Sequence, residues 1–355
     1  MKRFSLYLIA GILLSIPGYT QENPDSDSFK DKVQFSGYLD FYYSYDFSDP
    51  ANNQRLYVTQ AARHNEFNFN LAMLQADYVD DHFRATLALQ TGTYPLTNYA
   101  EPTVLGQILN EANIGVRVGK NSWIDVGIMG GHFGYESFRS IDNEVYTQAL
   151  VTEYTPYYQT GIQYSNQISE SLTVRAVVIN GWQNIYETNN AKAAGLAVDY
   201  KLADNIVLGY GNYFGNEPDF VDPDVDELRL HNSIYGKYDA DVFLLMANLD
   251  MTIQNSAFVD EDKPVLFATV TGLLKISEKL DIGGRYEFVT DQNGILLSEG
   301  FSTNILTGSL NYKVFRNTMA RAEARLFFGD DPIWNVENGS QFNNQVLSFS
   351  LATGF

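Results

Sequence analysis

Only a few side chains in this sequence could perform catalysis. The chain has four histidines, His64, His82, His132 and His231, and no cysteine. A nucleophile and its base need hydrogen-bond contact and a third group that orients the base, and no local pattern around any histidine supplies such a set. Disulfides and thiol chemistry are excluded. The sequence therefore predicts no catalytic residues, no cofactor and no enzymatic activity.

Acidic residues gather at three places where a metal ion could bind. The clusters are Asp222, Asp224 and Asp226; Asp260, Glu261 and Asp262; and Asp330 and Asp331. The first cluster has the alternate spacing of a calcium loop, but it lacks the central glycine and the bidentate glutamate that such a loop needs. We interpret all three as solvated loops and predict no metal site.

The composition describes a folded, acidic chain. Of its 355 residues, 45% are hydrophobic and 14% aromatic, whereas 19% are charged, against about 25% in an average soluble domain. The 43 acidic and 23 basic residues give a net charge of −20. This charge repels a phosphate backbone, so nucleic acid is excluded as a partner.

The first residues have the features of an export signal. Lys2 and Arg3 precede an apolar run that ends at Ile16, and small or polar residues follow. The run is too short to span a bilayer comfortably. We therefore predict a signal peptide over 1–20, cleaved near Thr20. No later stretch holds 18 consecutive apolar residues, so no transmembrane helix is expected.

The rest of the chain alternates between apolar and polar residues, which is the pattern of half-buried β-strands. In the last segment Leu347, Phe349 and Leu351 share one face, and Ser348 and Ser350 share the other. Sixteen segments of this kind begin near Val33, Asn65, Phe83, Ile108, Trp123, Tyr158, Leu172, Ala193, Asn205, Leu228, Val242, Pro264, Leu280, Ser302, Asn317 and Gln345.

The connections between these segments alternate in length. Short ones lie near Asp80, Lys120, Ser169, Ala203, Asp239, Glu278 and Arg316. Bacterial outer-membrane barrels have an even number of antiparallel strands, short periplasmic turns and longer outer loops, and sixteen strands leave an aqueous channel. We predict an all-β, up-and-down transmembrane β-barrel of about sixteen strands over 33–355, with 21–32 as a short periplasmic N-terminal arm.

Aromatic residues on the apolar faces support a membrane barrel, because such barrels carry an aromatic girdle at each bilayer interface. One predicted girdle contains Tyr78, Tyr164, Tyr200, Tyr238, Tyr312 and Phe355. The other contains Tyr43, Tyr45, Phe47, Trp182, Phe214, Phe288 and Phe328. The alternative is the core of a large secreted β-sandwich or propeller, which would not need two aromatic levels.

Charged residues indicate which face of each strand points inward. An arginine facing lipid at mid-bilayer costs roughly 2 to 4 kcal/mol, so charged faces must line the lumen. The predicted pore-lining residues are Arg285, Glu287, Arg321, Glu323, Arg325, Glu111 and Arg117. In the second strand the parity of Phe67, Phe69 and Leu71 differs from that of Leu74 and the residues after it, which predicts a β-bulge near Met73.

Several segments resemble the β-barrel porin family described as OmpL-like. They include FSGYLDFYYSYDF from Phe35, NEFNFNLAMLQADY from Asn65, TPYYQTG from Thr155 and INGWQNI from Ile179. The resemblance implies an outer-membrane barrel with porin function and names no substrate. The final strand, which ends at Phe355, also looks like a signal for the barrel-assembly machinery.

The longest connection, 132–156, follows the fifth strand. In general porins this loop folds into the channel, so resemblance of position makes it the constriction candidate, with Glu136, Arg139, Asp142 and Glu144 as constriction-loop residues. Its carboxylates would then oppose the predicted basic wall of Arg285, Arg321 and Arg325. Alternatively, each arginine pairs locally with Glu287 or Glu323 and only fills the wall. The alternative is a loop that lies on the outer rim.

These features favour a porin that allows passive diffusion of small hydrophilic solutes. Its expected location is the outer membrane of a Gram-negative type of cell. The alternative is an outer-membrane barrel with an occluded lumen that acts in adhesion or as a surface enzyme. Expected partners are outer-membrane lipids and lipopolysaccharide, whose phosphates could share divalent ions with the acidic loops. Whether the barrel forms a homo-oligomer stays open.

Overall fold

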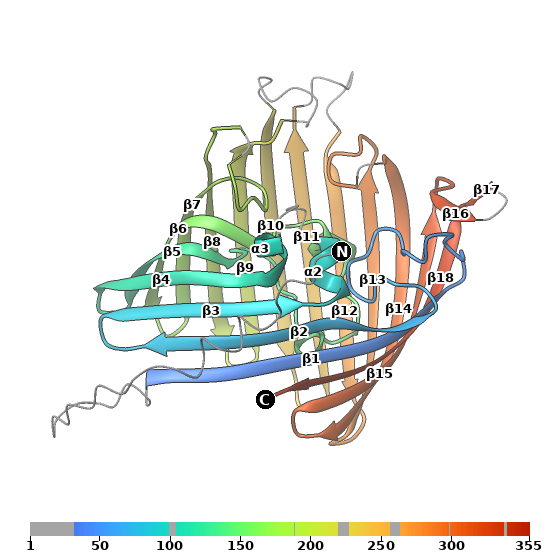
Figure 1. Ribbon diagram of the computed structural model, residues 1–355, viewed down its shortest axis with the longest axis horizontal. Coiled ribbons are helices and arrows are strands. Elements are labelled where there is room, and N and C mark those ends of the chain that lie inside the picture. Colours follow the sequence, from blue (N-terminus) through green and yellow to red (C-terminus); the bar gives the residue numbers. More distant parts are fainter. Residues whose placement is uncertain are drawn as a thin grey trace, which may run out of the picture.

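The fold was analysed in a computed structural model that describes residues 32–98, 104–187, 189–218, 227–255, 263–297, 299–336 and 339–355. Sixteen strands form one closed antiparallel barrel (Figure 1). The predicted signal peptide, most of the predicted arm and the acidic clusters at 222–226 and 260–262 lie outside the described residues. Within the described part of the chain, no helix is long and apolar enough to cross a membrane.

All sixteen predicted barrel strands are present. They are β1 (Val33–Asp46), β2 (Glu66–Val79), β3 (Phe83–Thr91), β4 (Leu109–Gly119), β5 (Ser122–Gly130), β6 (Tyr158–Ser169), β7 (Leu172–Ile179), β8 (Ala193–Ala203), β9 (Ile206–Asn216), β10 (Leu228–Asp239), β11 (Phe243–Gln254), β12 (Val265–Lys275), β13 (Leu280–Asp291), β14 (Phe301–Phe315), β15 (Thr318–Gly329) and β18 (Asn343–Gly354). Each strand pairs with its sequence neighbours, and β18 pairs with β1 to close the barrel.

Short elements occupy the long connections. They are α2 (Thr93–Asn98), α3 (Val104–Ile108), the 3-10 turn η1 (Ser140–Asp142), α4 (Leu150–Glu153) and the small hairpin β16 (Trp334–Val336) with β17 (Gly339–Gln341). The hairpin was not predicted from the sequence. Figure 1 shows β1–β4 crossing the view almost horizontally, whereas β10–β14 run upright.

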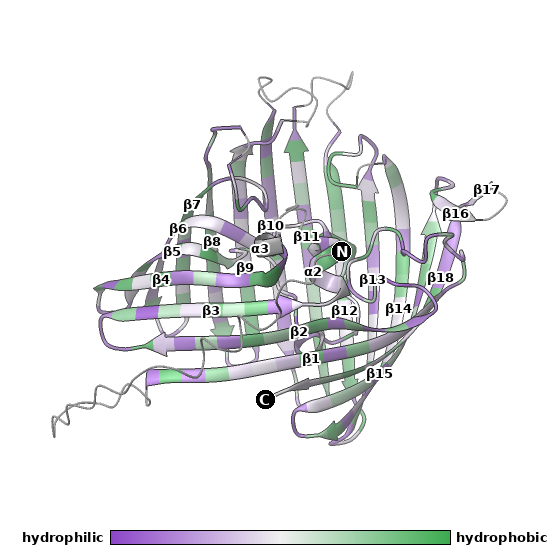
Figure 2. Ribbon diagram, viewed as in Figure 1, coloured by the Kyte–Doolittle hydropathy of each residue, from purple (hydrophilic) through white to green (hydrophobic). Residues whose placement is uncertain are grey.

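Hydropathy alternates along the strands as the sequence predicted (Figure 2). On β18, for example, Leu347, Phe349 and Leu351 are exposed on the outer face, and Ser348 and Ser350 are buried on the inner face. This pattern suits a wall with lipid on one side and polar groups on the other.

The inner face is not polar throughout, because part of it packs against a loop. Towards the long connections, inward side chains of β12–β15 and β18 form a hydrophobic core with α4. Its members include Val265, Phe267, Val289, Phe301, Ile305, Phe327 and Val346 from the wall, and Leu150 and Val151 from α4. Burying one such side chain stabilises a fold by about 1.5 to 3 kcal/mol, so the loop is held by apolar packing as well as by polar contacts.

The bulge in β2 lies at Asn70 and not near Met73. Asp40 of β1 is opposite Leu71 while Phe41 is opposite Phe69, which leaves Asn70 as the extra residue. Phe69 therefore faces outward and Leu71 inward. Asn70 donates from Nδ2 to Asp40 Oδ2 at 2.9 Å and accepts from the Ala61 N–H at 3.1 Å, contacts that no local pattern reveals.

The predicted position of Trp182 in an aromatic girdle is wrong. Its ring packs inside the barrel against Tyr213 at 4.8 Å and His231 at 5.3 Å between centroids, and Arg229 lies over it. Trp182 belongs to the connection after β7, which turns inward, so strand parity does not apply to it.

Phe355 completes the closure between β18 and β1. Its N–H donates to the Gly37 carbonyl at 3.0 Å, and the Gly37 N–H donates to the Phe355 carbonyl at 2.7 Å. A Cβ on Gly37 would lie 2.4 Å from Phe355 Cζ. The glycine therefore provides the space that the terminal ring fills.

Deleting Phe355 should lower the yield of folded, heat-modifiable barrel in outer membranes. The deletion removes two backbone hydrogen bonds of the closing seam, each worth about 0.5 to 1.5 kcal/mol net, together with the ring on Gly37. Electrophoresis of unheated membranes measures the folded fraction. Phe35→Ala is the control, because Phe35 is exposed on the same end of β1; an unchanged yield for the deletion would contradict this role.

Candidate functional site

The connection 131–157, called the inner loop below, crosses the interior of the barrel. It leaves β5, contacts β9, β10, β13, β15 and β1, and returns to β6. Few of its residues are helical, so most of its backbone groups need partners other than each other. The barrel wall supplies many of them.

Side chains of β15 bind the backbone of the inner loop. Arg321 donates to the carbonyls of Ser140, Asn143 and Val145, the last two at 2.6 and 3.1 Å. The carboxylate of Glu323 accepts from the N–H groups of Tyr146 and Thr147 and from the Thr147 hydroxyl. An arginine thus satisfies loop carbonyls, and the next inward residue on the strand satisfies loop amides.

The same arrangement occurs on β13. Arg285 donates to the carbonyls of Thr147 and Gln148 at 2.6 and 2.8 Å, and Glu287 accepts from the Leu150 N–H at 2.6 Å. Arg285 also pairs with Glu136 of the loop at 3.0 Å. These contacts hold α4 against the wall.

Arg285, Glu287, Arg321, Glu323 and Arg325, called the charged wall below, are buried beneath the inner loop. Their exposed fractions lie between 1% and 5%. Arg285 and Arg325 both pair with Glu287, at 2.9 and 3.0 Å. The predicted basic wall and Glu136 are therefore in direct contact and do not face each other across an opening. Removing one member of such a buried pair typically costs about 3 to 5 kcal/mol.

The other predicted loop residues make separate contacts. Arg139 and Asp142 pair with each other at 2.7 Å and are partly exposed. Glu144 pairs with Lys237 of β10 at 3.3 Å. Burial raises the pKa of Glu136 above its usual value, although Arg285 favours the charged form.

Glu111 and Arg117 lie on β4, away from the charged wall. Glu111 is half-buried and accepts from Asn113 Nδ2 at 3.2 Å. Arg117 is exposed near the short turn after β4, and its guanidinium carbon lies 4.8 Å from the ring centroid of Trp123. The structure thus divides the seven predicted pore-lining residues between two sides of the barrel.

Two ion pairs that the sequence analysis missed lie near Glu111 and Arg117, on the side of the lumen that the inner loop leaves open. Arg84 of β3 donates to Asp125 of β5 at 2.6 Å. Arg175 of β7 pairs with Asp199 of β8 at 2.6 Å, and these two side chains are 28% and 33% exposed. The parity rule that selected Arg285 would also have selected Arg84 and Arg175.

These charges, of which Asp125 is buried and Arg84, Arg175 and Asp199 are partly exposed, lie between the inner loop and the short turns. Towards the long connections, inward polar side chains of the same strands are buried, among them Gln90, Asn110 and Gln159. Here α2 places Tyr94 against Tyr157 of the inner loop, with 5.4 Å between ring centroids. Polar side chains of these strands are therefore buried at the level of the inner loop, and several charged ones are partly exposed nearer the short turns.

Inward glycines make room for the inner loop. A Cβ on Gly195 would lie 2.2 Å from His132 Nε2, and one on Gly211 would lie 2.3 Å from Phe133 Cβ. A Cβ on Gly283 would lie 2.5 Å from the Glu144 carbonyl oxygen. Strands β8, β9 and β13 therefore each lack a side chain where the loop passes.

One group of side chains resembles a catalytic set, but it is sealed. His231 Nδ1 lies 2.8 Å from Thr252 Oγ1, and its Nε2 lies 3.2 Å from Asp250 Oδ1 without hydrogen-bond geometry. All three side chains are at most 2% exposed, and the ring of Phe133 stacks on His231. Through the stacking of Phe133 on His231, this buried group contacts the start of the inner loop.

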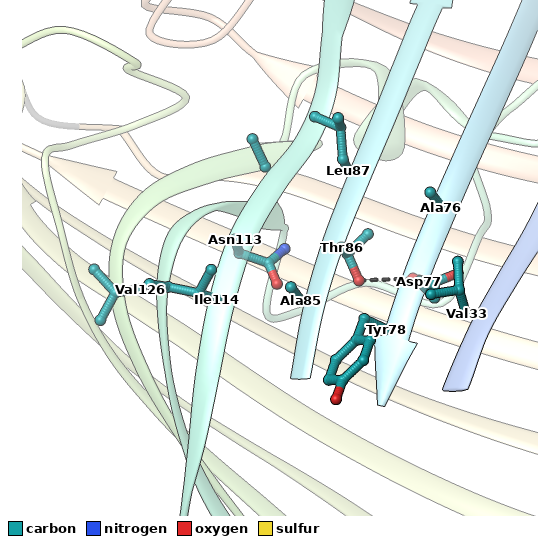
Figure 3. A pocket seen from close by; sticks show the side chains of 11 residues that line it. Val33, Ala76, Asp77, Tyr78, Ala85, Thr86, Leu87, Asn113, Ile114 and Val126 are labelled. Carbon is teal, nitrogen blue, oxygen red and sulfur yellow. Dashed lines mark hydrogen bonds between the residues drawn. The ribbon is translucent and has the colours of Figure 1, made fainter. Parts of the chain in front are cut away.

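A hollow of about 490 Å³ lies on the outer face of β1–β5 (Figure 3). Leu87, Ile114 and Val126 line it with exposed apolar side chains. A hollow of this kind faces lipid in a membrane barrel and lacks the converging polar groups of a solute site. Among the residues that the structure describes, no group of acidic residues and histidines could hold a metal ion.

A closed antiparallel barrel of sixteen strands, with a long loop folded across its interior, is the architecture of the porin class. The family model described as Putative beta-barrel porin-2, OmpL-like matches residues 32–355, so the chain belongs to that family. No curated protein sequence matches the chain.

Solved porin structures share the fold at low sequence identity. The channel DcaP of Acinetobacter baumannii is 10% identical, with a TM-score of 0.63 over 91% of this chain and 97% of that chain. An anion-selective porin from Comamonas acidovorans is 11% identical, with a TM-score of 0.60 over 91% and 99%. OmpT, an outer membrane protein of Vibrio cholerae, is 13% identical, with a TM-score of 0.58 over 91% and 97%.

Gly283→Ala should loosen the inner loop. The new methyl group would collide with the Glu144 carbonyl, which Asn311 Nδ2 holds at 2.8 Å, and overpacking of this kind costs about 1 to 3 kcal/mol. Denaturant unfolding of the barrel in lipid vesicles measures the loss.

Gly284→Ala provides a matched control. Gly284 is the next residue but faces outward, and the nearest atom to its Cβ would be 3.8 Å away. Equal free energies of unfolding for the two variants would show that the inner loop does not depend on the space at Gly283.

Proposed function

We propose that the protein is an outer-membrane porin that lets small hydrophilic solutes diffuse through its lumen. The observation that carries the proposal is the wall left open by the inner loop, where Arg84, Arg175 and Asp199 stay partly exposed inside the barrel. Charged groups are costly to place in a membrane protein unless they face water or pair. Here they do both.

In this proposal the two groups of charges have different tasks. The charged wall anchors the inner loop, because its donors and acceptors are used by the loop backbone. Selectivity between ions is set by the half-exposed pairs on β3–β8, with Glu111 and Arg117 beside them. Glu136 belongs to the anchor, whereas Arg139, Asp142 and Glu144 lie on the lower side of the constriction.

The family and the structural neighbours support a channel rather than an enzyme. The sealed surroundings of His231 agree with this view. We place the barrel in the outer membrane of a Gram-negative type of cell, with lipids and lipopolysaccharide around it and with Phe355 recognised by the assembly machinery. A trimer form among the neighbours makes a homo-oligomer a reasonable expectation.

Conductance across planar bilayers tests the proposal. Arg175→Gln removes a positive charge from the lumen and should raise the permeability ratio of cations to anions. A unit charge about 10 Å from a passing ion in water changes the local concentration of that ion about twofold, and the effect should be largest at low salt. Reversal potentials in a salt gradient measure the ratio.

Asp199→Asn is the reciprocal control, because it removes the negative partner of the same pair and should lower the ratio. A folded parental barrel without conductance would contradict the proposed function. Unchanged reversal potentials in both variants would show instead that selectivity is set elsewhere in the lumen.

The orientation of the barrel gives a second prediction. A tag inserted beside Asp331, in the long connection after β15, should react with antibody on intact cells. A tag at Ala203, the last residue of β8 before the short turn, should react only after the outer membrane is permeabilised. Surface labelling at Ala203 would reverse the proposed topology.

A further inference from the structure

The connection 47–65 between β1 and β2, called the first loop below, also folds inward and lies on the inner loop. Gln60 is fully buried between them. Its Oε1 accepts from the Gln148 N–H at 3.1 Å, and its Nε2 donates to the Phe138 carbonyl at 3.2 Å. Ala61 packs with Tyr146 of the inner loop. The two loops therefore form one layer across the lumen.

The backbone of the first loop is held in a costly shape. Five of its residues, Asp49, Asn53, Tyr57, Ala61 and Asn65, have φ between 51° and 59°. Asparagine and aspartate adopt left-handed backbone comparatively readily, but at Tyr57 and Ala61 it costs of order 1 to 3 kcal/mol each and persists only where the surroundings enforce it. The contacts with the inner loop are part of that enforcement, so the first loop should relax when they weaken.

Glu153, at the end of α4, makes the contacts between the two loops that depend on a titratable group. Its Oε2 accepts from the N–H of Thr59 at 3.0 Å, from the Thr59 hydroxyl, and from the Tyr157 hydroxyl at 3.3 Å. The residue is 6% exposed. Its Oε1 is buried and makes no hydrogen bond of good geometry among the described residues, although the Gln60 N–H lies close enough to the carboxylate to favour its charged form. A buried carboxylate oxygen without a partner is expensive to keep charged.

We propose that Glu153 and Thr59 are positioning residues for transport: they clamp the first loop onto the inner loop, and protonation of Glu153 decides how firmly the constriction is held. The contact between the two loops is stable at acidic pH and weak at alkaline pH. Loss of a proton from Glu153 lets the first loop lift and widens the passage past the inner loop. This inference rests on the proposed porin function for its electrical readout.

The surroundings of Glu153 set the direction of this effect. Burial raises its pKa from 4.5 to about 7, while the Thr59 contacts and the charge of Arg325 on β15 act in the opposite sense. The other titratable groups around it are the hydroxyls of Tyr154 and Tyr157. Because the clamped form has the higher pKa, clamping is favoured fully below pH 4.5 and is progressively lost as the pH rises through 7.

These values define the expected size of the effect. With a pKa of about 7 in the clamped form and 4.5 in the released form, the equilibrium constant for clamping falls about tenfold between pH 6 and pH 8. In planar bilayers the dwell time of the lowest stable conductance level should therefore shorten about tenfold over this interval. Glu153→Gln carries a permanently neutral group of the same shape, so its dwell time should stay long and independent of pH.

Two further variants separate the clamp from general destabilisation. Thr59→Val removes a hydroxyl that favours the charged form of Glu153, so the midpoint of the pH profile should move to higher pH. Glu299→Gln is the control, because Glu299 also accepts from the first loop, through the Tyr57 hydroxyl at 3.2 Å, but is exposed. Its profile should match that of the parent. A parental profile that persists in Glu153→Gln would overturn the inference.

Limited trypsin digestion gives a readout that does not need conductance. Arg55 is 3% exposed and should be cut only when the first loop lifts. At pH 8, cleavage after Arg55 should be at least about tenfold slower in folded Glu153→Gln than in the parent. Cleavage after Lys120, which is exposed in the short turn between β4 and β5, should be equal in both. Equal rates of cleavage after Arg55 in the parent and in Glu153→Gln would refute the clamp, even if the parent conducts. A parent without conductance would refute only the proposed porin function.

Discussion

The interior of this barrel is governed by the need to satisfy the backbone of a loop that has almost no regular structure. A buried N–H or C=O without a partner costs free energy comparable to a lost hydrogen bond, and a loop inside a barrel has no neighbouring strand to pair with. The charged wall replaces that strand: Arg321 and Arg285 bind carbonyls, and Glu323 and Glu287 bind amides. The charged wall and Glu136 together contain three arginines and three glutamates, so the interface between the wall and the inner loop is close to neutral.

This arrangement makes the two sides of the barrel different. From β12 to β15 the loop, the charged wall and the apolar cluster around Phe267 and Leu150 form a solid core like that of a soluble domain. From β3 to β8 the wall carries the ion pairs Arg84–Asp125 and Arg175–Asp199, in which every member but Asp125 is partly exposed. The packed side therefore positions the loop, and in the proposed function the other side is the one that solutes pass. The same residue types, arginine and carboxylate, serve both sides, and burial alone distinguishes their tasks.

Much of the fold follows from the sequence because strand parity depends on local alternation. All sixteen barrel strands, and the inward direction of Arg285 and Arg321, were predicted in this way. Parity does not reveal what an inward side chain touches, since the partners of Arg321 are loop carbonyls with no sequence signature. It also fails where the chain leaves the sheet, as at Trp182, and where one residue is inserted, as at Asn70. The clamp at Glu153 depends on contacts between two loops and was beyond any local pattern.

The long sequence separation between the inner loop and its anchors has a consequence for biogenesis. The anchoring residues on β13 and β15 follow their loop partners by 137 to 181 residues, so these contacts form only after most of the wall has been laid down. Contacts of such high sequence separation are the slow ones in folding. The contacts that hold the inner loop are thus expected among the last to form, so the barrel wall can close before its interior is packed.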